Sequence, residues 1–533
     1  MFDVIVIGTG AGGGTMAHAL AATGARMLVV ERGEAVPREA ENWSPDAVWK
    51  DLRYRTREKW LDGEGAEFQP YMHYGIGGNT KYWGSVLYRL RREDFEAMEH
   101  MEGVSPAWPI GYDTLAPYYD RAERLYQVHG ATGDDPTEPP HGPYPHAPVP
   151  HAAGMTRIVG ALRRMGLHPS PLPLGLIDPG LPGGCVLCNT CNSFPCRINR
   201  KSDADVCCVG PAATQANVTL WTSATARRLL TDPSGRRVEA IEVERDGQLV
   251  RVCAPVVIVS CGAVNSAALL LRSANDKHPD GLANSSGLVG THYMAHLATM
   301  MQGVSWRANR DEFQKTLAIN DFYLPGAHTD YPLGQIQSQG RTHAIMAKVV
   351  GDTWRYKFIE WRHIPLWAYA AWMTRAIDWL AMTEDLPRPE NRVTIAPDGR
   401  IRLAYRPNNT RAHTRLVEEL RRVLGRLGYW SPKVFAHSTG VKNTTHQCGT
   451  LRFGVDPRTS VLDPFCRTHD IENLFVVDGS FFPSSAAVNP GLTIIAQALR
   501  VADHINDRRR APGAEAAEAG AAPGGAAARE THT

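Results

Sequence analysis

The sequence has little excess charge of either sign. Its 57 lysines and arginines nearly balance 55 aspartates and glutamates, which leaves a net charge of +2 at pH 7. Nucleic acids and anionic membrane surfaces attract strongly basic proteins. We therefore expect neither nucleic acid nor a membrane as a partner. No basic segment with an apolar run after it precedes the first predicted strand, so we expect no secretory signal and a cytoplasmic protein.

Long apolar runs without charges are also missing. The nearest candidate is Ile364–Thr383, which approaches the length needed to span a membrane but contains Arg375 and Asp378. Either charge would be costly in hydrocarbon. We therefore expect a buried or substrate-covering element at this position. The chain also contains no internal repeat.

The first residues follow the order strand, glycine turn, helix, strand and acid. We predict strands over 2–7 and 27–30 and a helix over 15–23. This is the order of a dinucleotide-binding βαβ unit. Gly8 permits a tight turn, Gly10 lets the backbone approach a pyrophosphate, and Gly13 allows close packing of helix on strand. Glu31 stands where an acid should accept hydrogen bonds from an adenosine ribose.

A chain of 533 residues is too long for one compact core, so we expect two domains. Elsewhere we predict strands over 218–221, 240–243, 256–259 and 473–477, and helices over 112–128, 266–272 and 492–505. Between about residues 299 and 429 tryptophan, tyrosine and arginine become more frequent, which indicates the second domain. The tail from residue 508 is rich in alanine, glycine, proline and glutamate and lacks aromatic residues, a composition typical of disorder.

Further motifs occur in a fixed order along nearly the whole chain. They are the Gly8 turn with Glu31–Gly33, Gly77–Asn79, Trp108–Pro109 with Tyr118–Tyr119, Gly287–Gly290, His446–Thr450, Asn473–Ser480 with Pro483, and Asn489–Thr493. Together they resemble the glucose–methanol–choline (GMC) family of flavoprotein oxidoreductases. Within that family, the sequence looks most like the pyranose-oxidase-like bacterial members that act on sugars and glycosides.

The resemblance implies an α/β fold with two domains. A Rossmann-like FAD-binding domain would comprise residues 1–100, 205–298 and 440–507, and a sheet-plus-helix substrate-binding domain with covering loops would comprise 101–204 and 299–439. Residues 508–533 would form the disordered tail. The implied cofactor-binding residues are Gly8, Gly10, Ala11, Gly12, Gly13, Glu31, Arg32, Gly78, Asn79, Gly84, Asp478, Gly479 and Pro490.

Oxidation of an alcohol requires a base for the hydroxyl proton and an acceptor for the hydride. The flavin accepts the hydride, and histidine suits the role of base near neutral pH. By resemblance, His446 matches the catalytic histidine of the family and Asn489 the second catalytic position. Asn489 precedes a proline and also suits the role of a helix cap. His296 and His437 are weaker candidates for the base, and we favour structural roles for each.

The loop that carries the flavin linkage in some relatives differs here. Fungal pyranose oxidases attach their flavin through a histidine in a Ser-Thr-His-Trp loop. The matching residues are Thr80-Lys81-Tyr82-Trp83, so Tyr82 stands where the linking histidine would be. This difference predicts non-covalent FAD.

Four cysteines, Cys185, Cys188, Cys191 and Cys196, follow the spacing C-x2-C-x2-C-x4-C. An iron–sulfur run of the ferredoxin type has a final gap of three residues and a proline after the last cysteine, whereas here the gap is four and Pro195 comes before it. One alternative is a bound cluster or metal, as in some dehydrogenases of the family. The other, which we favour, is a loop of reduced or partly paired cysteines with no metal.

These observations predict an FAD-dependent enzyme that oxidises a hydroxyl of a sugar, aminosugar or glycoside to a carbonyl. Oxygen or another electron acceptor would reoxidise the flavin. Two alternatives remain open: an iron–sulfur-linked sugar dehydrogenase subunit that passes electrons to a partner, and a flavin-bound lyase.

Overall fold

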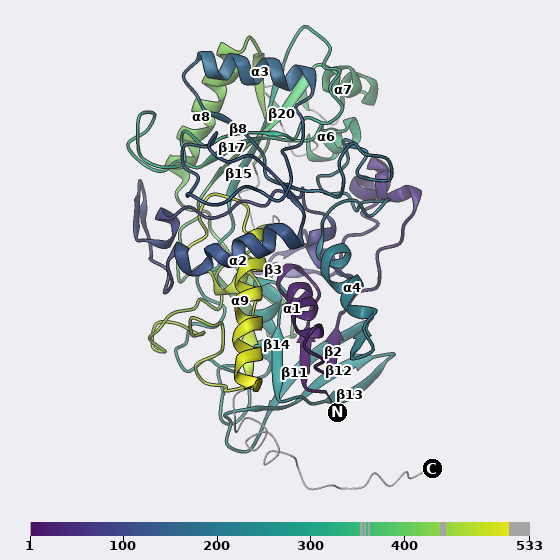
Figure 1. Cartoon of the computed structure of the whole chain (residues 1–533), viewed down its shortest axis with the longest axis vertical. Coiled ribbons are helices and arrows are strands. Elements are labelled where there is room, and N and C mark those ends of the chain that lie inside the picture. Colours follow the sequence, from purple (N-terminus) through teal and green to yellow (C-terminus); the bar gives the residue numbers. More distant parts are fainter. Residues whose placement is uncertain (1, 352–354, 357–358, 361–362, 438–443, 511–533) are drawn as a thin grey trace.

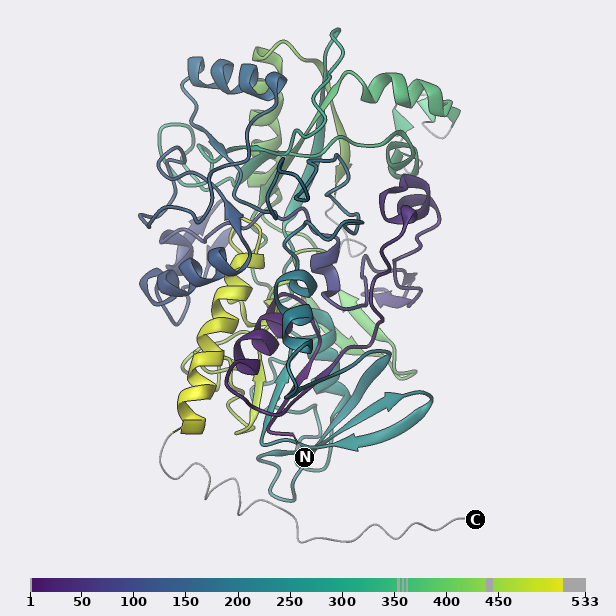
Figure 2. The ribbon, with the colours of Figure 1, turned by 45° about the vertical axis from the view of Figure 1, so that its right-hand side comes forward.

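The structure is a computed structural model of the chain, and it describes residues 2–351, 355–356, 359–360, 363–437 and 444–510. The molecule is elongated, with one large sheet toward each end of its long axis (Figure 1). The N-terminal strands and the C-terminal helix lie at the same end, as the turned view also shows (Figure 2).

One end is built on a parallel sheet of five strands in the order β10-β2-β1-β14-β24. They are β1 (Val4–Ile7), β2 (Met27–Val30), β10 (Val218–Trp221), β14 (Val256–Val259) and β24 (Leu474–Val476). In the register, Ile7 pairs with Val30 and with Val259. The turns that follow these strands therefore meet at one edge of the sheet, where ligands bind in doubly wound folds.

Helices α1 (Ala11–Ala21) and α9 (Gly491–Arg510) pack against each other along this sheet (Figures 1 and 2). The strands predicted at 27–30, 218–221 and 256–259 are confirmed. Helix α1 begins four residues earlier than predicted, within the glycine run. A Cβ at Gly12 would lie 1.8 Å from the Val477 carbonyl oxygen. A Cβ at Gly13 would lie 2.1 Å from the Gly8 carbonyl oxygen. Close packing on the sheet therefore outweighs the poor helix propensity of glycine.

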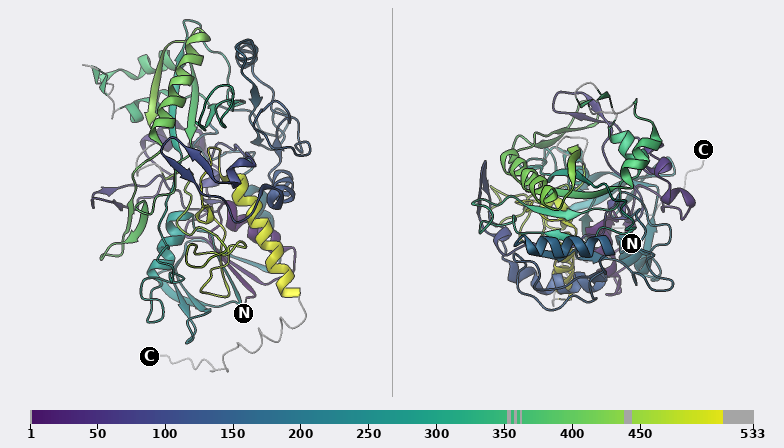
Figure 3. Two further views of the ribbon diagram at one scale, coloured as in Figure 1. Left: turned by 90° about the vertical axis from the view of Figure 1, so that its left-hand side faces the viewer. Right: turned by 90° about the horizontal axis from the view of Figure 1, so that it is seen from above.

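The other end holds a six-stranded sheet, β23-β15-β20-β17-β16-β8, in which all neighbours are antiparallel. Its strands are β8 (Pro169–Pro171), β15 (Leu297–Val304), β16 (Leu317–Ile319), β17 (Gln335–Ser338), β20 (Ala376–Thr383) and β23 (Trp430–His437). Helices α3 (Ala153–Arg164) and α8 (Thr410–Arg426) share a buried apolar cluster with these strands (Figure 3).

The stretch Ile364–Thr383 forms two elements of this second end. Helix α7 (Leu366–Met373) occupies its first half and strand β20 its second. Asp378 lies on β20, where its buried carboxylate accepts hydrogen bonds from Gln302 and Thr342. Among the described residues, no helix combines the length and apolar character that crossing a bilayer requires.

The remaining elements form smaller sheets and short helices. The sheets are β11 (Ala224–Thr231) with β12 (Val238–Arg245) and β13 (Gln248–Val252); β3 (Trp60–Asp62) with β4 (Glu67–Phe68), β21 (Arg392–Ile395) and β22 (Ile401–Ala404); and the pairs β5 (Met98–His100) with β6 (Gly103–Ser105), β7 (Val128–His129) with β9 (Leu174–Gly175), and β18 (Arg355–Tyr356) with β19 (Ile359–Glu360). The helices are α2 (Tyr112–Leu125), α4 (Gly210–Ala213), α5 (Ala263–Arg272) and α6 (Ala344–Gly351).

All strands of the five-stranded sheet lie within the segments predicted to bind FAD, and those of the six-stranded sheet lie in the substrate-binding segments, apart from the first two residues of β15. The boundaries between the two domains stay a prediction. The predicted tail begins at residue 508, whereas α9 continues to Arg510. Residues 511–533 lie outside the described residues.

Candidate active site

A cavity of about 1000 Å³ lies between the two large sheets. Its wall at one end is the edge of the five-stranded sheet, with Ile7 and Val30. At the other end, Met300, Gln337 and Leu380 come from strands β15, β17 and β20. All of the predicted cofactor-binding and catalytic residues line this cavity except Gly13, which lies beneath the turn against Gly8.

The glycine turn leaves open space on the cavity side. Gly8 adopts a φ of +98°, a conformation that favours glycine, and Gly10 precedes the first turn of α1. A Cβ at Gly10 would meet no atom of the described residues within 4 Å. The unpaired N–H groups at the start of α1 thus face a space in which a phosphate group fits.

Glu31 stabilises this turn directly. Its buried carboxylate accepts hydrogen bonds from the backbone N–H of Thr9 (3.1 Å), the Thr9 hydroxyl (2.6 Å) and the N–H of Gly33 (3.0 Å). Burial raises the pKa of Glu31, and these hydrogen bonds oppose the shift. The sequence did not identify Thr9 as a site residue, yet its hydroxyl also accepts from the N–H of Gly77 (3.0 Å) and joins the turn to the second glycine loop.

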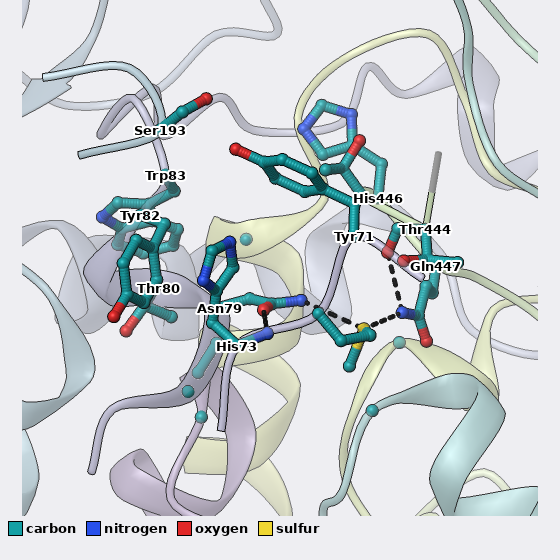
Figure 4. A pocket seen from close by; sticks show the side chains of 18 of the residues that line it. Tyr71, His73, Asn79, Thr80, Tyr82, Trp83, Ser193, Thr444, His446 and Gln447 are labelled. Carbon is teal, nitrogen blue, oxygen red and sulfur yellow. Dashed lines mark hydrogen bonds between the residues drawn. The ribbon is translucent and has the colours of Figure 1, made fainter. Parts of the chain in front are cut away.

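The second glycine loop, Gly77–Gly84, packs on the first. Gly77 and Gly78 both have positive φ, and a Cβ at Gly78 would lie 3.4 Å from the Cα of Gly10. The Asn79 side chain accepts from the N–H of His73 and contacts the sulfur of Met72 (Figure 4). The same sulfur accepts a hydrogen bond from Gln447. Met72 thus connects this loop to the segment that carries His446.

Asp478 follows strand β24 and stabilises neighbouring loops. Its carboxylate accepts from the N–H of Gly262 (3.0 Å), the hydroxyl of Ser266 (2.5 Å) and the N–H of Ser480 (2.9 Å). Burial raises the pKa of Asp478. A Cβ at Gly479 would lie 2.3 Å from the Gln447 carbonyl oxygen, so the backbone here must be close to the histidine segment.

His446 and Asn489 lie together, as the resemblance predicted. Nε2 of His446 is 3.3 Å from Nδ2 of Asn489, and Nδ1 of His446 is 2.9 Å from Nδ1 of His296. His446 is half-buried and has a φ of +52°. His296, for which the sequence favours a structural role, lies in the cavity wall in direct contact with the candidate base.

The hydrogen bonds in this group determine which nitrogen of His446 carries the proton. Nε2 of His296 is 3.1 Å from the Ser485 carbonyl oxygen, which can only accept, so this nitrogen donates. Nδ1 of neutral His296 then accepts from Nδ1–H of His446. The lone pair of His446 is consequently on Nε2, on the side of Asn489. Burial, with smaller effects of His296 and Lys315, lowers the pKa of His446 to about 3 and keeps the imidazole neutral.

Tyr82, the residue in place of a linking histidine, stacks on His73 with ring centroids 3.7 Å apart (Figure 4). His73 is buried, and its Nδ1 is 2.9 Å from the Tyr54 carbonyl oxygen, to which it donates. Its Nε2 is a buried atom without a hydrogen-bond partner in the described part of the chain, as is Nε1 of Trp83. Both residues line the cavity, so a ligand with polar ring atoms would find partners here.

The cysteine run lies beside the cavity. All ten cysteines are described, and none forms a disulfide. Within the described residues, no three histidine, cysteine, aspartate or glutamate side chains are placed to hold a metal ion. The buried ammonium of Lys201 donates to the carbonyls of Lys81, Trp83, Cys191 and Phe194, and so joins the cysteine run to the second glycine loop.

Comparison with known proteins identifies the family. The model of the GMC oxidoreductase N-terminal region matches residues 12–298, and that of the C-terminal region matches residues 387–498. Paromamine 6'-oxidase of Streptomyces fradiae is 32% identical, with 95% of this chain and 91% of that protein covered. The 6'''-hydroxyparomomycin C oxidase of Streptomyces lividus is 33% identical, with 96% and 93% covered. The large subunit of fructose dehydrogenase from Gluconobacter japonicus is 27% identical, with 95% and 98% covered.

Solved structures agree on the fold. The crystal structure of pyridoxine 4-oxidase from Mesorbium loti superposes with a TM-score of 0.65 at 19% identity, over 95% of this chain and 99% of that one. Formate oxidase of Aspergillus oryzae superposes with a TM-score of 0.64 at 15% identity. The superposition covers 96% of this chain and 98% of that one. The chain therefore belongs to the GMC oxidoreductase family and is an FAD-dependent oxidoreductase.

Proposed function

We propose that this enzyme oxidises a hydroxyl of a sugar, aminosugar or glycoside to a carbonyl, with oxygen or another electron acceptor taking up the electrons. The observation that carries the proposal is the neutral imidazole of His446, whose Nε2 lone pair lies beside Asn489 in the cavity wall. Relatives named as oxidases of paromamine and hydroxyparomomycin C, and one named as a fructose dehydrogenase, support the substrate class.

The two glycine loops and the neighbouring His73 fit FAD, because the space beside Gly10 is open and buried polar atoms of His73 and Trp83 have no partner among the described residues. Gly8, Gly10 and the start of α1 would hold the pyrophosphate, and Gly78 and Asn79 would lie along the cofactor. Bound there, FAD would supply the hydride acceptor. We propose that it is held without a covalent bond, because tyrosine stands at position 82.

His446 would accept the hydroxyl proton at Nε2. Its Nδ1–H is already engaged by His296, so the acceptor nitrogen cannot exchange roles without breaking that hydrogen bond. Asn489 would donate from Nδ2 to the substrate oxygen and hold it beside Nε2. In that arrangement the substrate hydroxyl would take the place of the direct contact between Nδ2 of Asn489 and Nε2 of His446.

An anaerobic screen of sugars and glycosides against the purified yellow protein tests the proposal. At least one of them should bleach the oxidised flavin spectrum, and the product should carry a new carbonyl. A lyase would turn over its substrate with the spectrum unchanged. If no hydroxyl compound bleaches the flavin, the proposed reaction is wrong.

A further inference from the structure

We infer that Lys315, together with Asn192 and Gln339, selects the substrate by its charge. These residues favour sugars that are neutral or carry a carboxylate over sugars that carry an ammonium group. The inference rests on the proposed function and narrows its substrate class.

Lys315 is a buried cation that lines the cavity just before strand β16. Its Nζ donates to Oδ1 of Asn192 at 2.5 Å, and no carboxylate pairs with it among the residues that the structure describes. An ammonium group has three donors. A buried charge with one neutral partner is poorly compensated, so an acceptor supplied by a ligand would stabilise it.

Two amides extend this group. Nδ2 of Asn192 donates to Oε1 of Gln339 at 2.6 Å. Nε2 of Gln339 is buried, and no described atom accepts a hydrogen bond from it. All three side chains line the cavity and present donors to it, and of the described neighbours in the wall Gln337 has a buried Oε1 without a partner. Hydroxyl and carboxylate oxygens satisfy such donors, whereas an ammonium group cannot accept.

The group lies close to the reacting end of the cavity. A Cβ at Gly84 would lie 1.7 Å from Nζ of Lys315 and 2.3 Å from Oδ1 of Asn192, so both side chains pack directly on the second glycine loop. The positive charge of Lys315 also contributes to the lowered pKa of His446. A sugar whose hydroxyl reaches His446 therefore lies within the electrostatic reach of Lys315.

Among the described residues that line the cavity, no carboxylate lies at this end beside Lys315, although Asp378, buried behind the wall, interacts with Arg341. The described acidic residues in the wall are Glu31, Glu58 and Asp478. Glu31 and Asp478 follow strands of the five-stranded sheet, and Glu58 accepts a hydrogen bond from Tyr74 at 2.6 Å. Toward the six-stranded sheet the wall carries Lys315 and Arg341, and Arg341 donates to the carbonyl oxygens of Asn309 and Asp311.

A ligand ammonium would thus enter a desolvated region of like charge, where repulsion between unit charges is much stronger than in water. A neutral hydroxyl avoids this repulsion, and a carboxylate gains attraction. Burial lowers the pKa of Lys315 to about 7. The preference between charged and neutral sugars is therefore measured below pH 7, where the Lys315 side chain is charged.

The test uses derivatives of the best sugar found in the anaerobic screen: a free amine, its N-acetyl amide and a carboxylate at the same position. The quantity measured is the second-order rate of flavin reduction. We expect the N-acetyl form to react at least about tenfold faster than the amine. In Lys315→Met, which keeps the chain length but removes the charge, the ratio should fall below about threefold.

Arg272→Met is the matched control, because Arg272 also lines the cavity but lies on α5 beside the five-stranded sheet. It should retain the parent ratio. Equal rates for amine and amide in the parent enzyme, or an unchanged ratio in flavin-loaded Lys315→Met, would overturn the inference. If Lys315→Met loses its flavin, Lys315→Gln replaces it. If no sugar reduces the flavin, the proposed function fails, and the charge preference is read from the shift in Tm with a simple free aminosugar, its N-acetyl amide and a sugar carboxylate.

Discussion

Replacing His446 by asparagine tests the proposed base with little disturbance of the backbone. His446 has a φ of +52°, and asparagine tolerates this left-handed conformation better than most residues. The substitution removes the Nε2 lone pair beside Asn489 and the hydrogen bond to His296. The glycine loops that line the rest of the cavity are unchanged, so FAD content should stay close to that of the parent.

The expected loss follows from the role of the lone pair. A positioned general base typically contributes about 10²- to 10⁴-fold, or roughly 3 to 5 kcal/mol of barrier. His292→Asn is the control. His292 has a φ of +59°, and burial lowers the pKa of its imidazole to about 4, but it lies outside the cavity wall. The control should reduce its flavin at the parent rate.

Anaerobic single-turnover measurements at saturating substrate report flavin reduction alone, whereas kcat also contains reoxidation. Because the pKa of His446 is lowered to about 3, its imidazole stays unprotonated well below neutral pH. The parent rate should therefore not fall with an apparent pKa near 6.5. A flavin-loaded His446→Asn enzyme that reacts at the parent rate would refute the assignment, and a loss of the parent rate near pH 6.5 would refute the lowered pKa.

Four further outcomes are expected. Gly10→Val should fold, because its Cβ meets no atom of the described residues, but should bind no FAD, as absorbance per protein would show; a yellow variant would contradict this. Acid precipitation should release the flavin into the supernatant, since tyrosine stands at position 82 where the linking histidine would be; flavin in the pellet would indicate a covalent attachment. Protein purified without air should contain no iron or acid-labile sulfide at the cysteine run 185–196, whereas stoichiometric iron would favour the dehydrogenase-subunit alternative. His296→Leu should slow flavin reduction about tenfold or more, because Nδ1–H of His446 loses the acceptor that keeps its lone pair on Nε2; an unchanged rate would leave His296 a purely structural role.

Local patterns were sufficient to predict the cofactor end of the fold. Continuous β-branched runs predicted strands such as Val256–Val259, and parallel pairing then brings the turns after those strands to one edge. This is why residues as distant as Gly8 and Asp478 line one cavity. The start of α1 was not predictable from propensity, because glycine within this helix is favoured by close contacts with the carbonyls of Val477 and Gly8.

The substrate end depends on contacts that no local pattern contains. His296 precedes β15 and meets His446 across 150 positions, and Lys315 meets Asn192 across 123. Neither residue stands in a motif that separates it from other histidines and lysines of the chain. For the cysteines the spacing alone was ambiguous, because a ligand run and an ordinary loop can have similar spacing.

The positions of the cavity residues along the chain also determine when flavin can bind during synthesis. A chain emerges from the ribosome N-terminus first, so β1, β2 and the turn at Gly8 appear within the first few dozen residues. Strand β24 and the residues from Asp478 to Ile494, which close the other side of the same wall, appear only near the end. A nascent chain that stops before Leu474 has a glycine turn but an incomplete cavity. Flavin should therefore bind only after the segment through Ile494 has been synthesised, and chains truncated before Leu474 should accumulate as colourless protein.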